Sequence, residues 1–350
     1  MEIELSGGVQ ARFSYGRLAP SDDGEGEGEN VDRLGFGVRR ARFRSLATIG
    51  SNAGVFLQLA GGGTLGVLDA YGFYQPSDHW RLRFGRMATA QPRASRLTSF
   101  TRIDAIARPE IVDKWASGTI GAGGRDFGLD AIYTSDRGEA ILAVHNGDGS
   151  WNRQRGNYRP DVNNALDGTE RLGMAASLYG AYEPEALQGV EVGGYVGYNG
   201  SGNPNTAAFG EGRTYLSYAA HAYWGAAPGS QPLRLKADLI GVDYEVLEDA
   251  IGPKEDFDQR TMGLSLLGAG RVHQAGEVFA RLELYDPNNS IFDFDDQERY
   301  VTVGGSFSLS ALRGQPYRRQ RLTLAYTGLL PEAEGRANQH LVVLQAQLIF

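Results

Sequence analysis

The segment from His340 to Phe350 reads HLVVLQAQLIF. Counting back from Phe350, every second residue is apolar and the residues between them are more polar; the apolar set is Val342, Leu344, Ala346 and Leu348. A period of two belongs to an extended strand, whose successive side chains point to opposite faces. The segment is therefore predicted to be a β-strand with one apolar and one polar face.

The same alternation recurs along the whole chain. In residues 2–15, Ile3, Leu5, Val9 and Phe13 share one face with their apolar neighbours, while Glu2, Glu4, Gln10 and Arg12 lie on the other. Segments of about ten residues are long enough for a tilted strand to cross a bilayer. Sixteen such segments are predicted: 2–15, 33–46, 53–61, 64–74, 80–86, 125–134, 139–146, 170–182, 189–199, 213–224, 233–245, 259–272, 276–286, 298–312, 318–329 and 340–350.

The composition suits many strands joined by turns. The chain has 350 residues with 49 glycines, 17 tyrosines, 15 phenylalanines and no cysteine, and its mean hydropathy is −0.34. No apolar run is long enough for a transmembrane helix, but a membrane barrel needs apolar residues only at alternate positions. Without cysteine there is neither a disulfide nor a thiolate metal site. The net charge of −8 argues against nucleic-acid binding.

The connections between the predicted strands alternate in length. Short ones such as Gln75–Asp78 and Ser135–Gly138 are rich in turn-forming residues, and long ones include 16–32, 87–124 and 147–169. Short turns at one end and long loops at the other are typical of transmembrane β-barrels. We therefore predict an all-β fold, a single antiparallel sixteen-stranded barrel domain over residues 1–350, with fourteen or eighteen strands as the alternatives.

A strand that ends on an aromatic carboxyl-terminal residue resembles the closing strand of bacterial outer-membrane barrels. This resemblance implies location in the bacterial outer membrane and makes Phe350 part of the signal read by the barrel-assembly machinery. Outer-membrane lipids and lipopolysaccharide would then be further partners. No export signal precedes Glu2, so Met1 is expected to begin a mature or recombinant form.

The connection 87–124 differs from the acidic loops around it. It carries apolar residues that could anchor it to a wall, among them Leu97, Phe100, Ile106 and Trp115. It is net basic in a net acidic protein. Its charged residues are predicted to form a pore constriction: Arg93, Arg96, Arg102 and Arg108, with Lys114 nearby, opposed by Asp104, Glu110 and Asp113.

Four short motifs resemble the phosphate-selective porin O and P family. They are Val38–Phe43 (VRRARF), Phe84–Met87 (FGRM), Leu97–Arg102 (LTSFTR) and Gly124–Gly128 (GRDFG), in the family's order over residues 30–130. The resemblance implies a sixteen-stranded, usually trimeric porin that prefers anions, with a constriction loop folded into the lumen. On the wall, it points to Arg39, Arg81, Arg83 and Arg125 as residues along the anion path.

Two differences from the family's motifs bear on which ion the pore would prefer. The family's GQFK-like element is Gly85-Arg86-Met87 here, and the only lysines are Lys114, Lys236 and Lys254, so there is no lysine ladder. Arginine binds oxyanions through two donors, which favours phosphate or carboxylate over chloride. The opposing acids would instead create a transverse field with mild selectivity, as in general porins, and the sequence leaves both open.

Other interpretations of the same residues remain. Arg40, Arg42 and Arg44 share one face of a regular strand, and Arg39 faces the other way unless a bulge intervenes. Some of these arginines could form wall salt bridges, and the loop arginines could pair with acids that pin the loop. Asp293, Asp295 and Asp296 could bind calcium at the surface, although the spacing matches no known calcium motif.

The predicted function is passive diffusion of small ions and solutes through an anion-preferring outer-membrane porin, a homotrimer without a cofactor or metal. A plugged structural or adhesin barrel is the first alternative. An outer-membrane enzyme is a weaker one, because none of the five histidines lies in a motif with a nucleophile.

Overall fold

The computed structural model describes residues 1–18, 31–61, 66–120, 123–147, 174–203, 213–245, 259–287, 297–332 and 337–350. Sixteen strands make up most of it: β1 (Glu2–Leu18), β2 (Val31–Ile49), β3 (Ala53–Gly61), β4 (Gly66–Tyr74), β5 (Trp80–Met87), β6 (Asp126–Thr134), β7 (Gly138–His145), β8 (Ala175–Tyr182), β9 (Val190–Asn203), β10 (Arg213–Trp224), β11 (Leu233–Glu245), β12 (Gln259–His273), β13 (Gly276–Asp286), β14 (Glu298–Ser308), β15 (Gln320–Pro331) and β16 (Gln339–Ile349).

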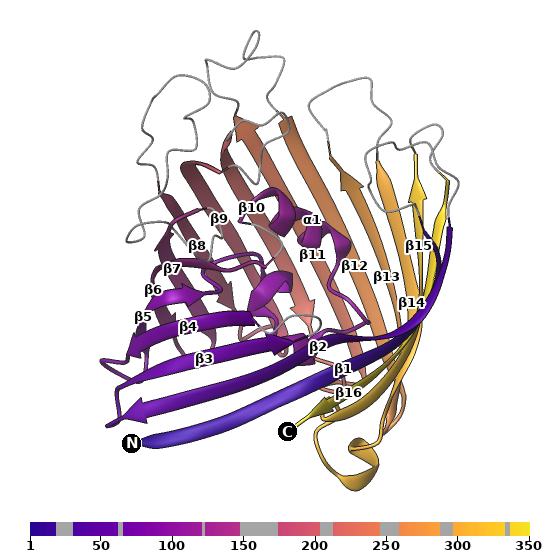
Figure 1. Ribbon diagram of the computed structural model, residues 1–350, viewed down its shortest axis with the longest axis horizontal. Coiled ribbons are helices and arrows are strands. Elements are labelled where there is room, and N and C mark those ends of the chain that lie inside the picture. Colours follow the sequence, from indigo (N-terminus) through magenta and orange to yellow (C-terminus); the bar gives the residue numbers. More distant parts are fainter. Residues whose placement is uncertain are drawn as a thin grey trace.

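The strands form one closed antiparallel barrel in which each pairs with its sequence neighbours (Figure 1). Closure is made by β1 and β16, with Val9 opposite Leu348 and Tyr15 opposite Val342. The predicted sixteen-stranded barrel is confirmed. The boundaries differ at some ends: the segment 298–312 stops as a strand at Ser308, and a single 3-10 turn, Ala311–Arg313, follows.

The burial pattern is the reverse of that in a water-soluble sheet. On β16, apolar Leu344 and Leu348 are about half exposed, while Gln345 and Gln347 are 1% and 4% exposed. The apolar face predicted from HLVVLQAQLIF thus points outward and the polar face points into the barrel. An apolar exterior around a polar interior is the arrangement of a transmembrane β-barrel.

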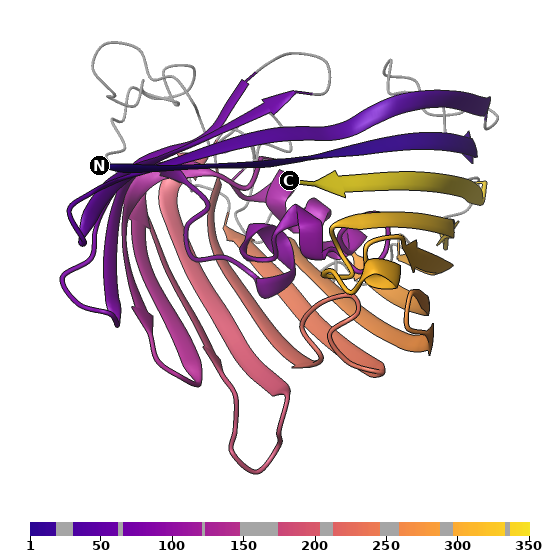
Figure 2. The ribbon, with the colours of Figure 1, turned by 90° about the horizontal axis from the view of Figure 1, so that it is seen from below.

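The two ends of the barrel differ. Both chain termini lie at the end that carries short turns such as Gln75–His79 and Ser135–Arg137 (Figure 1). In the view from below, the strands surround three short helical segments: a π-helical turn (Arg93–Leu97), a 3-10 turn (Phe100–Arg102) and helix α1 (Glu110–Gly118) (Figure 2). No helix in the described part of the chain is long and apolar enough to cross a membrane.

Candidate functional site: the arginine stripe and the inner loop

The described residues of the connection between β5 and β6, 88–120 and 123–125, lie inside the barrel and are called the inner loop below. Its helix α1 packs on the inner faces of β10 and β11, where Ile111, Val112 and Trp115 join a buried cluster with Tyr215 and Val242. The Tyr244 hydroxyl also donates a hydrogen bond to the Gly118 carbonyl (2.8 Å). The predicted loop 87–124 therefore corresponds to a real segment that occupies the lumen.

Phe100 anchors the other side of the inner loop. It is 1% exposed and lies against β1, where a Cβ added to Gly8 would come within 3.2 Å of its ring. The Gln10 amide donates to the Phe100 carbonyl (3.3 Å). Glycine at position 8 thus leaves the space that the ring fills, and the loop is fixed to both β1 and β11.

The four loop arginines named from the sequence have different environments. Arg93 forms an ion pair with Glu191 of β9 (2.7 Å), and Arg96 lies 3.6 Å from Asp113 while donating to the Gly123 carbonyl. Arg102 is exposed. Together with Arg83, these three line a cavity of about 520 Å³ between the inner loop and the short turn at Ser135–Gly138.

Arg108 lies inside the fold of the loop rather than on its surface. It is 2% exposed, and its Nε and Nη2 donate to the carbonyls of Ser95 (2.8 Å) and Thr98 (2.6 Å). Burial, with a smaller contribution from Arg96 and Arg40, holds its pKa well below the usual range. The side chain braces the loop and does not line an open path.

The three acidic residues predicted for the constriction also differ in their surroundings. Asp104 pairs with Lys236 (2.9 Å) and with Arg234, which in turn pairs with Glu277. Burial would raise the Asp104 pKa, but the two cations outweigh it and lower the value. Asp104 therefore fixes the inner loop to the wall at β11.

Glu110 and Asp113 lie on α1, and both side chains are partly buried. Burial, together with repulsion from Glu283 and Asp113, raises the pKa of Glu110 to about 7. Lys114 reaches from the same helix to Glu298 of β14 (2.9 Å). Helix α1 thus carries two carboxylates and one cation, and its Asp113 also lies near Arg96.

Three of the wall arginines named from the sequence have partners. Arg83 pairs with Asp130, and Arg125 pairs with Asp69 (2.8 Å). Arg81 is exposed near the short turns, where it donates to the Gln75 amide oxygen (2.9 Å). Ion pairs thus hold Arg83 and Arg125 at the wall, and a hydrogen bond to an amide oxygen holds Arg81.

Arg39 is placed by a bulge. Gln10 pairs with Arg40 and Ala11 pairs with Val38, so Arg39 is an extra residue in β2. Its guanidinium lies close enough to Arg12 and Arg40 to repel both. The bulge that the sequence analysis required for Arg39 and Arg40 to share one face is therefore present.

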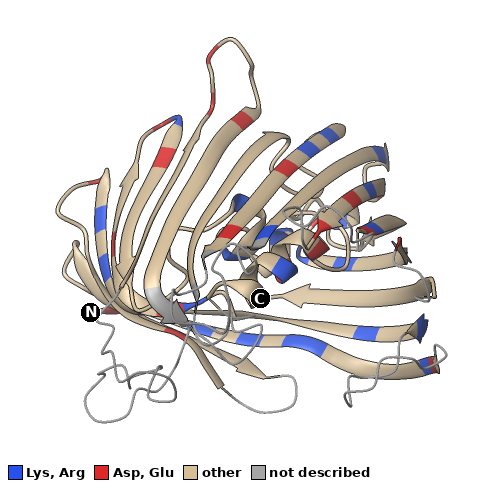
Figure 3. Ribbon diagram, turned by 90° about the horizontal axis from the view of Figure 1, so that it is seen from above, with Lys and Arg blue, Asp and Glu red and all other residues tan. Residues whose placement is uncertain are grey.

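A run of cations on β1 and β2 contains Arg39 and four further arginines that were not named as site residues. Arg12, Arg39, Arg40, Arg42 and Arg44, called the arginine stripe below, face the lumen, and among the described residues none has a carboxylate within 4.0 Å. Figure 3 shows the blue bands of β1 and β2 beside the C-terminal strand. Alternation within RRARFR already indicated a shared face for three of them.

The stripe is held by neutral partners instead of acids. Arg12 donates to the Gln345 amide oxygen (2.7 Å), Arg40 to that of Gln10 (3.1 Å) and Arg44 to that of Gln58 (2.6 Å). Arg42 and Arg44 also lie over the Phe100 ring, 4.8 and 5.4 Å from its centroid. Amide oxygens and a ring face orient a guanidinium without neutralising its charge.

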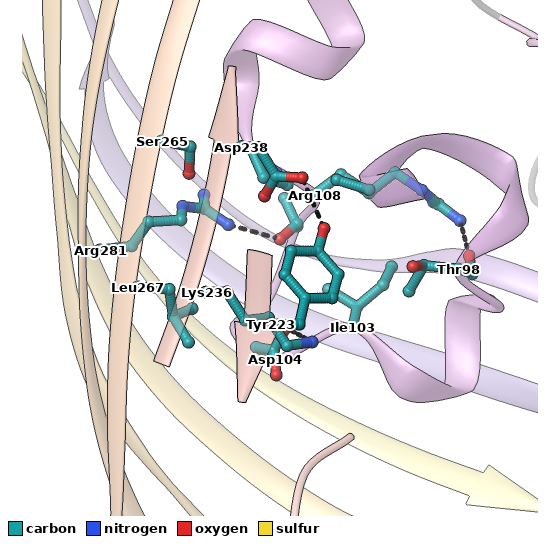
Figure 4. Close-up of a pocket in the computed structure, with 13 residues that line it drawn as sticks. Thr98, Ile103, Asp104, Arg108, Tyr223, Lys236, Asp238, Ser265, Leu267 and Arg281 are labelled. Carbon is teal, nitrogen blue, oxygen red and sulfur yellow. Dashed lines mark hydrogen bonds and ion pairs between the residues drawn. The ribbon is translucent and has the colours of Figure 1, made fainter. Parts of the chain in front are cut away.

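A second cavity lies behind the inner loop, against β11 and β12 (Figure 4). The Tyr223 hydroxyl donates to the Asp238 carboxylate (2.6 Å), and Arg281 donates to the Ala107 carbonyl (3.0 Å). Asp104 and Lys236 close one side of this space. It lies between the inner loop and the wall, and we regard it as part of the loop's attachment.

One triad-like arrangement bears on the enzyme alternative. His145 Nδ1 lies 2.8 Å from Asp126, and its Nε2 lies 3.5 Å from the Ser177 hydroxyl. All three residues are at most 4% exposed, and the Ser177 hydroxyl also contacts the Ala90 carbonyl (3.2 Å) at the root of the inner loop. A buried serine under the loop offers a substrate no access, so this group attaches the loop to the wall.

No group of three or more metal-ligating side chains occurs among the described residues. The calcium prediction at Asp293, Asp295 and Asp296 lies outside the described residues.

Comparison with solved structures identifies the fold. The anion-selective porin from Comamonas acidovorans matches with a TM-score of 0.68 at 15% identity, covering 100% of this chain and 99% of that one. The channel DcaP of Acinetobacter baumannii matches at 0.62 with 11% identity (100% and 97% covered), and OprB of Pseudomonas putida at 0.62 with 12% (99% and 94%). No family model and no curated protein sequence matches the chain.

The chain therefore has the fold of bacterial outer-membrane porins. A barrel with an apolar exterior and this fold belongs in the bacterial outer membrane, in agreement with the prediction from the sequence.

Proposed function

We propose that the chain is an outer-membrane porin through which small hydrophilic ions and solutes diffuse passively, with a preference for anions. The general channel function agrees with the fold shared with porins. The preference for anions is inferred from the arginine stripe, whose five charges have no carboxylate partner among the described residues.

The proposed constriction lies between the arginine stripe and α1. β2 and β11 are seven strands apart by the shorter way round a barrel of sixteen, so the stripe and the Glu110–Asp113 face of α1 approach from different sides of the lumen. This assigns the cationic wall to Arg12, Arg39, Arg40, Arg42 and Arg44, with Arg96 and Arg102 from the loop. Arg93, Arg108, Arg83 and Arg125 would act by holding the loop and wall in place.

The electrostatics support an anion path that does not trap its ions. A unit charge about 4 Å from an anion contributes roughly 4 kcal/mol at an effective dielectric constant near 20. Several guanidinium groups along the path provide several weak sites in succession, and conduction needs such multiple sites so that an ion can leave again. Bidentate donors also favour oxyanions such as phosphate over chloride.

The experiment is the reversal potential of the purified protein in a planar bilayer under a KCl gradient. The wild-type protein should favour chloride, and Arg40→Gln with Arg42→Gln should move the potential toward zero. Arg299→Gln is the matched control, because Arg299 lies at the outward rim of β14 and pairs with Glu332. Cation preference in the wild-type protein would refute the proposed selectivity.

The plugged barrel is kept as the second candidate because of one observation. The inner loop is fixed to β1, β9 and β11 by buried contacts, which would also suit a permanent plug. Absence of conductance steps from folded protein would favour it.

A further inference from the structure

The cavity of about 520 Å³ lies between the inner loop and the wall formed by β6, β7 and β8, beside the short turn Ser135–Gly138. This turn belongs to the end of the barrel that also carries the chain termini, which is the end seen in Figure 2. Small-molecule sites in proteins have volumes of roughly 300 to 1,000 Å³. The cavity is therefore large enough for a small organic solute.

One side of the cavity is apolar. Ile132, Ile141 and Tyr179 lie opposite one another on three adjacent strands and form a row across the wall. Leu97 faces this row from the inner loop. Since Leu97 and Ile132 are only partly buried, apolar surface remains open to the cavity, and an apolar part of a solute would be stabilised by contact with it.

Several of the charged groups around the cavity already have partners. Arg83 pairs with Asp130, and Arg93 pairs with Glu191 (2.7 Å). Each cation of these pairs is matched by its own carboxylate. The pairs hold the wall and the inner loop together and leave little net charge for a solute.

Glu139 has no such partner. It lines the cavity from β7, two residues before Ile141 and on the same face of the strand. Among the described residues, no Lys, Arg or His nitrogen lies within 4.0 Å of its carboxylate. The cations that act on it from further away are Arg83 and Arg93, which already pair with other acids. The wall side of the cavity thus favours a positively charged group.

Arg102 is the corresponding cation on the loop side. Its side chain is exposed, lines the same cavity and has no carboxylate within 4.0 Å in the described part of the chain. The charges that act on it come from Arg318 and Arg93, which are also cations. A guanidinium group binds a carboxylate through two parallel hydrogen bonds. The loop side of the cavity thus favours a carboxylate.

We propose that this cavity binds a short zwitterionic peptide with apolar side chains. The peptide's ammonium group lies at Glu139, its carboxylate lies at Arg102, and its side chains contact Leu97 and Ile132. The proposal goes beyond passive diffusion because it assigns a binding site for one class of solute. It shares Arg102 with the proposed anion path.

Other classes of solute match the cavity less well. An anion would be repelled by Glu139 and by the further acids Asp136 and Glu183 that line the cavity. A cation would be repelled by Arg102. A neutral solute would leave both Arg102 and Glu139 without an opposite charge, whereas a zwitterion supplies one to each.

Calorimetric titration of the folded protein in detergent micelles with leucyl-leucine tests the site. At pH 7 the terminal ammonium group is mostly protonated, because the ordinary pKa of an α-amino group is about 7.7 to 8.0. N-acetyl-leucyl-leucine lacks the ammonium group, leucyl-leucine amide lacks the carboxylate, and glycyl-glycine lacks the apolar side chains. Each of the three should bind roughly tenfold more weakly than leucyl-leucine.

Substitutions then assign each charge of the peptide to its partner. Glu139→Gln should weaken the binding of leucyl-leucine roughly tenfold and leave that of N-acetyl-leucyl-leucine unchanged, since this ligand has no ammonium group. Glu4→Gln is the matched control, because Glu4 is exposed on β1 at the same end of the barrel and does not line the cavity. Arg102→Gln should weaken leucyl-leucine but not its amide. The gel shift of folded protein checks that each variant folds.

Three results would overturn the proposal: no binding of leucyl-leucine, N-acetyl-leucyl-leucine binding at least as tightly as leucyl-leucine, or equal effects of Glu139→Gln and Glu4→Gln. The second of these would make the cavity part of the anion path. Binding in micelles is measured without an ion gradient, so it is separate from the reversal potential. A protein that binds leucyl-leucine but prefers cations in a bilayer would refute only the proposed selectivity.

Discussion

Arg42 of β2 lies over the ring of Phe100 in the inner loop, with its guanidinium carbon 4.8 Å from the ring centroid. Arg44 lies over the same ring at 5.4 Å. One aromatic side chain therefore connects the position of the inner loop with the orientation of two charges in the arginine stripe. The loop and the stripe are parts of one arrangement.

Replacing Phe100 with leucine should loosen this connection. The ring contributes cation–π interactions of about 0.5 to 2 kcal/mol each, and leucine keeps most of the apolar volume. We expect larger current noise and a higher single-channel conductance, because the loop moves more freely within the lumen. Phe307→Leu, on the outer face of β14, is the control and should leave the current unchanged. Equal noise in both variants would contradict an anchoring role for Phe100.

Arg108 and Arg42 should give opposite results when each is replaced. Arg108→Met removes the buried donors to Ser95 and Thr98, so the current noise should rise while the reversal potential stays close to that of the wild type. Arg42→Met removes a charge from the lumen. A guanidinium about 10 Å from the ion path changes the ion's energy by roughly 0.4 to 1.7 kcal/mol at effective dielectric constants of about 80 to 20.

That energy corresponds to a fall of roughly two- to twentyfold in the Boltzmann factor of the anion on the path, and so to a fall of at least that size in the anion-to-cation permeability ratio. Reversal potentials and noise spectra of the two variants, recorded in the same salt gradient, would separate the roles. A large change of selectivity in Arg108→Met would place Arg108 on the ion path instead.

The contrast between these two arginines shows what the sequence could and could not predict. The alternation in HLVVLQAQLIF and RRARFR depends only on the period of a strand, so it predicted the barrel and the shared face of Arg40, Arg42 and Arg44. The roles of the loop arginines depend on which carbonyl or carboxylate lies nearby after the loop folds back. Arg93 meets Glu191 across 98 positions of sequence, and no local pattern encodes such a contact.

The bulge at Arg39 was only partly predictable from the sequence. Two adjacent arginines cannot both face the lumen from a regular strand, so RR indicated that a bulge could be present. Whether it forms depends on the register with β1, which the alternation in β2 alone does not fix.

The selectivity should depend on pH through Glu110. Its pKa is about 7, so the carboxyl is mostly neutral at pH 5.5 and mostly ionised at pH 8.5. Lowering the pH therefore removes a negative charge from the lumen, and the anion preference should increase. Reversal potentials at the two pH values would measure this change in anion preference, and Glu110→Gln should abolish most of the change. A step of the same size in Glu110→Gln would assign the titration to another group.

Asp104 should contribute to the stability of the barrel more than to its selectivity. Asp104→Asn leaves Arg234 and Lys236 without this carboxylate, and breaking a buried ion pair by removing one partner typically costs about 3 to 5 kcal/mol. The temperature at which the folded band converts to the unfolded band on a gel should fall clearly. Asp243→Asn is the matched control, because its ion pair with Arg260 is exposed at the barrel surface, and exposed pairs contribute about 0 to 1 kcal/mol. Equal effects of the two substitutions would show that the inner loop is not pinned to β11 through Asp104.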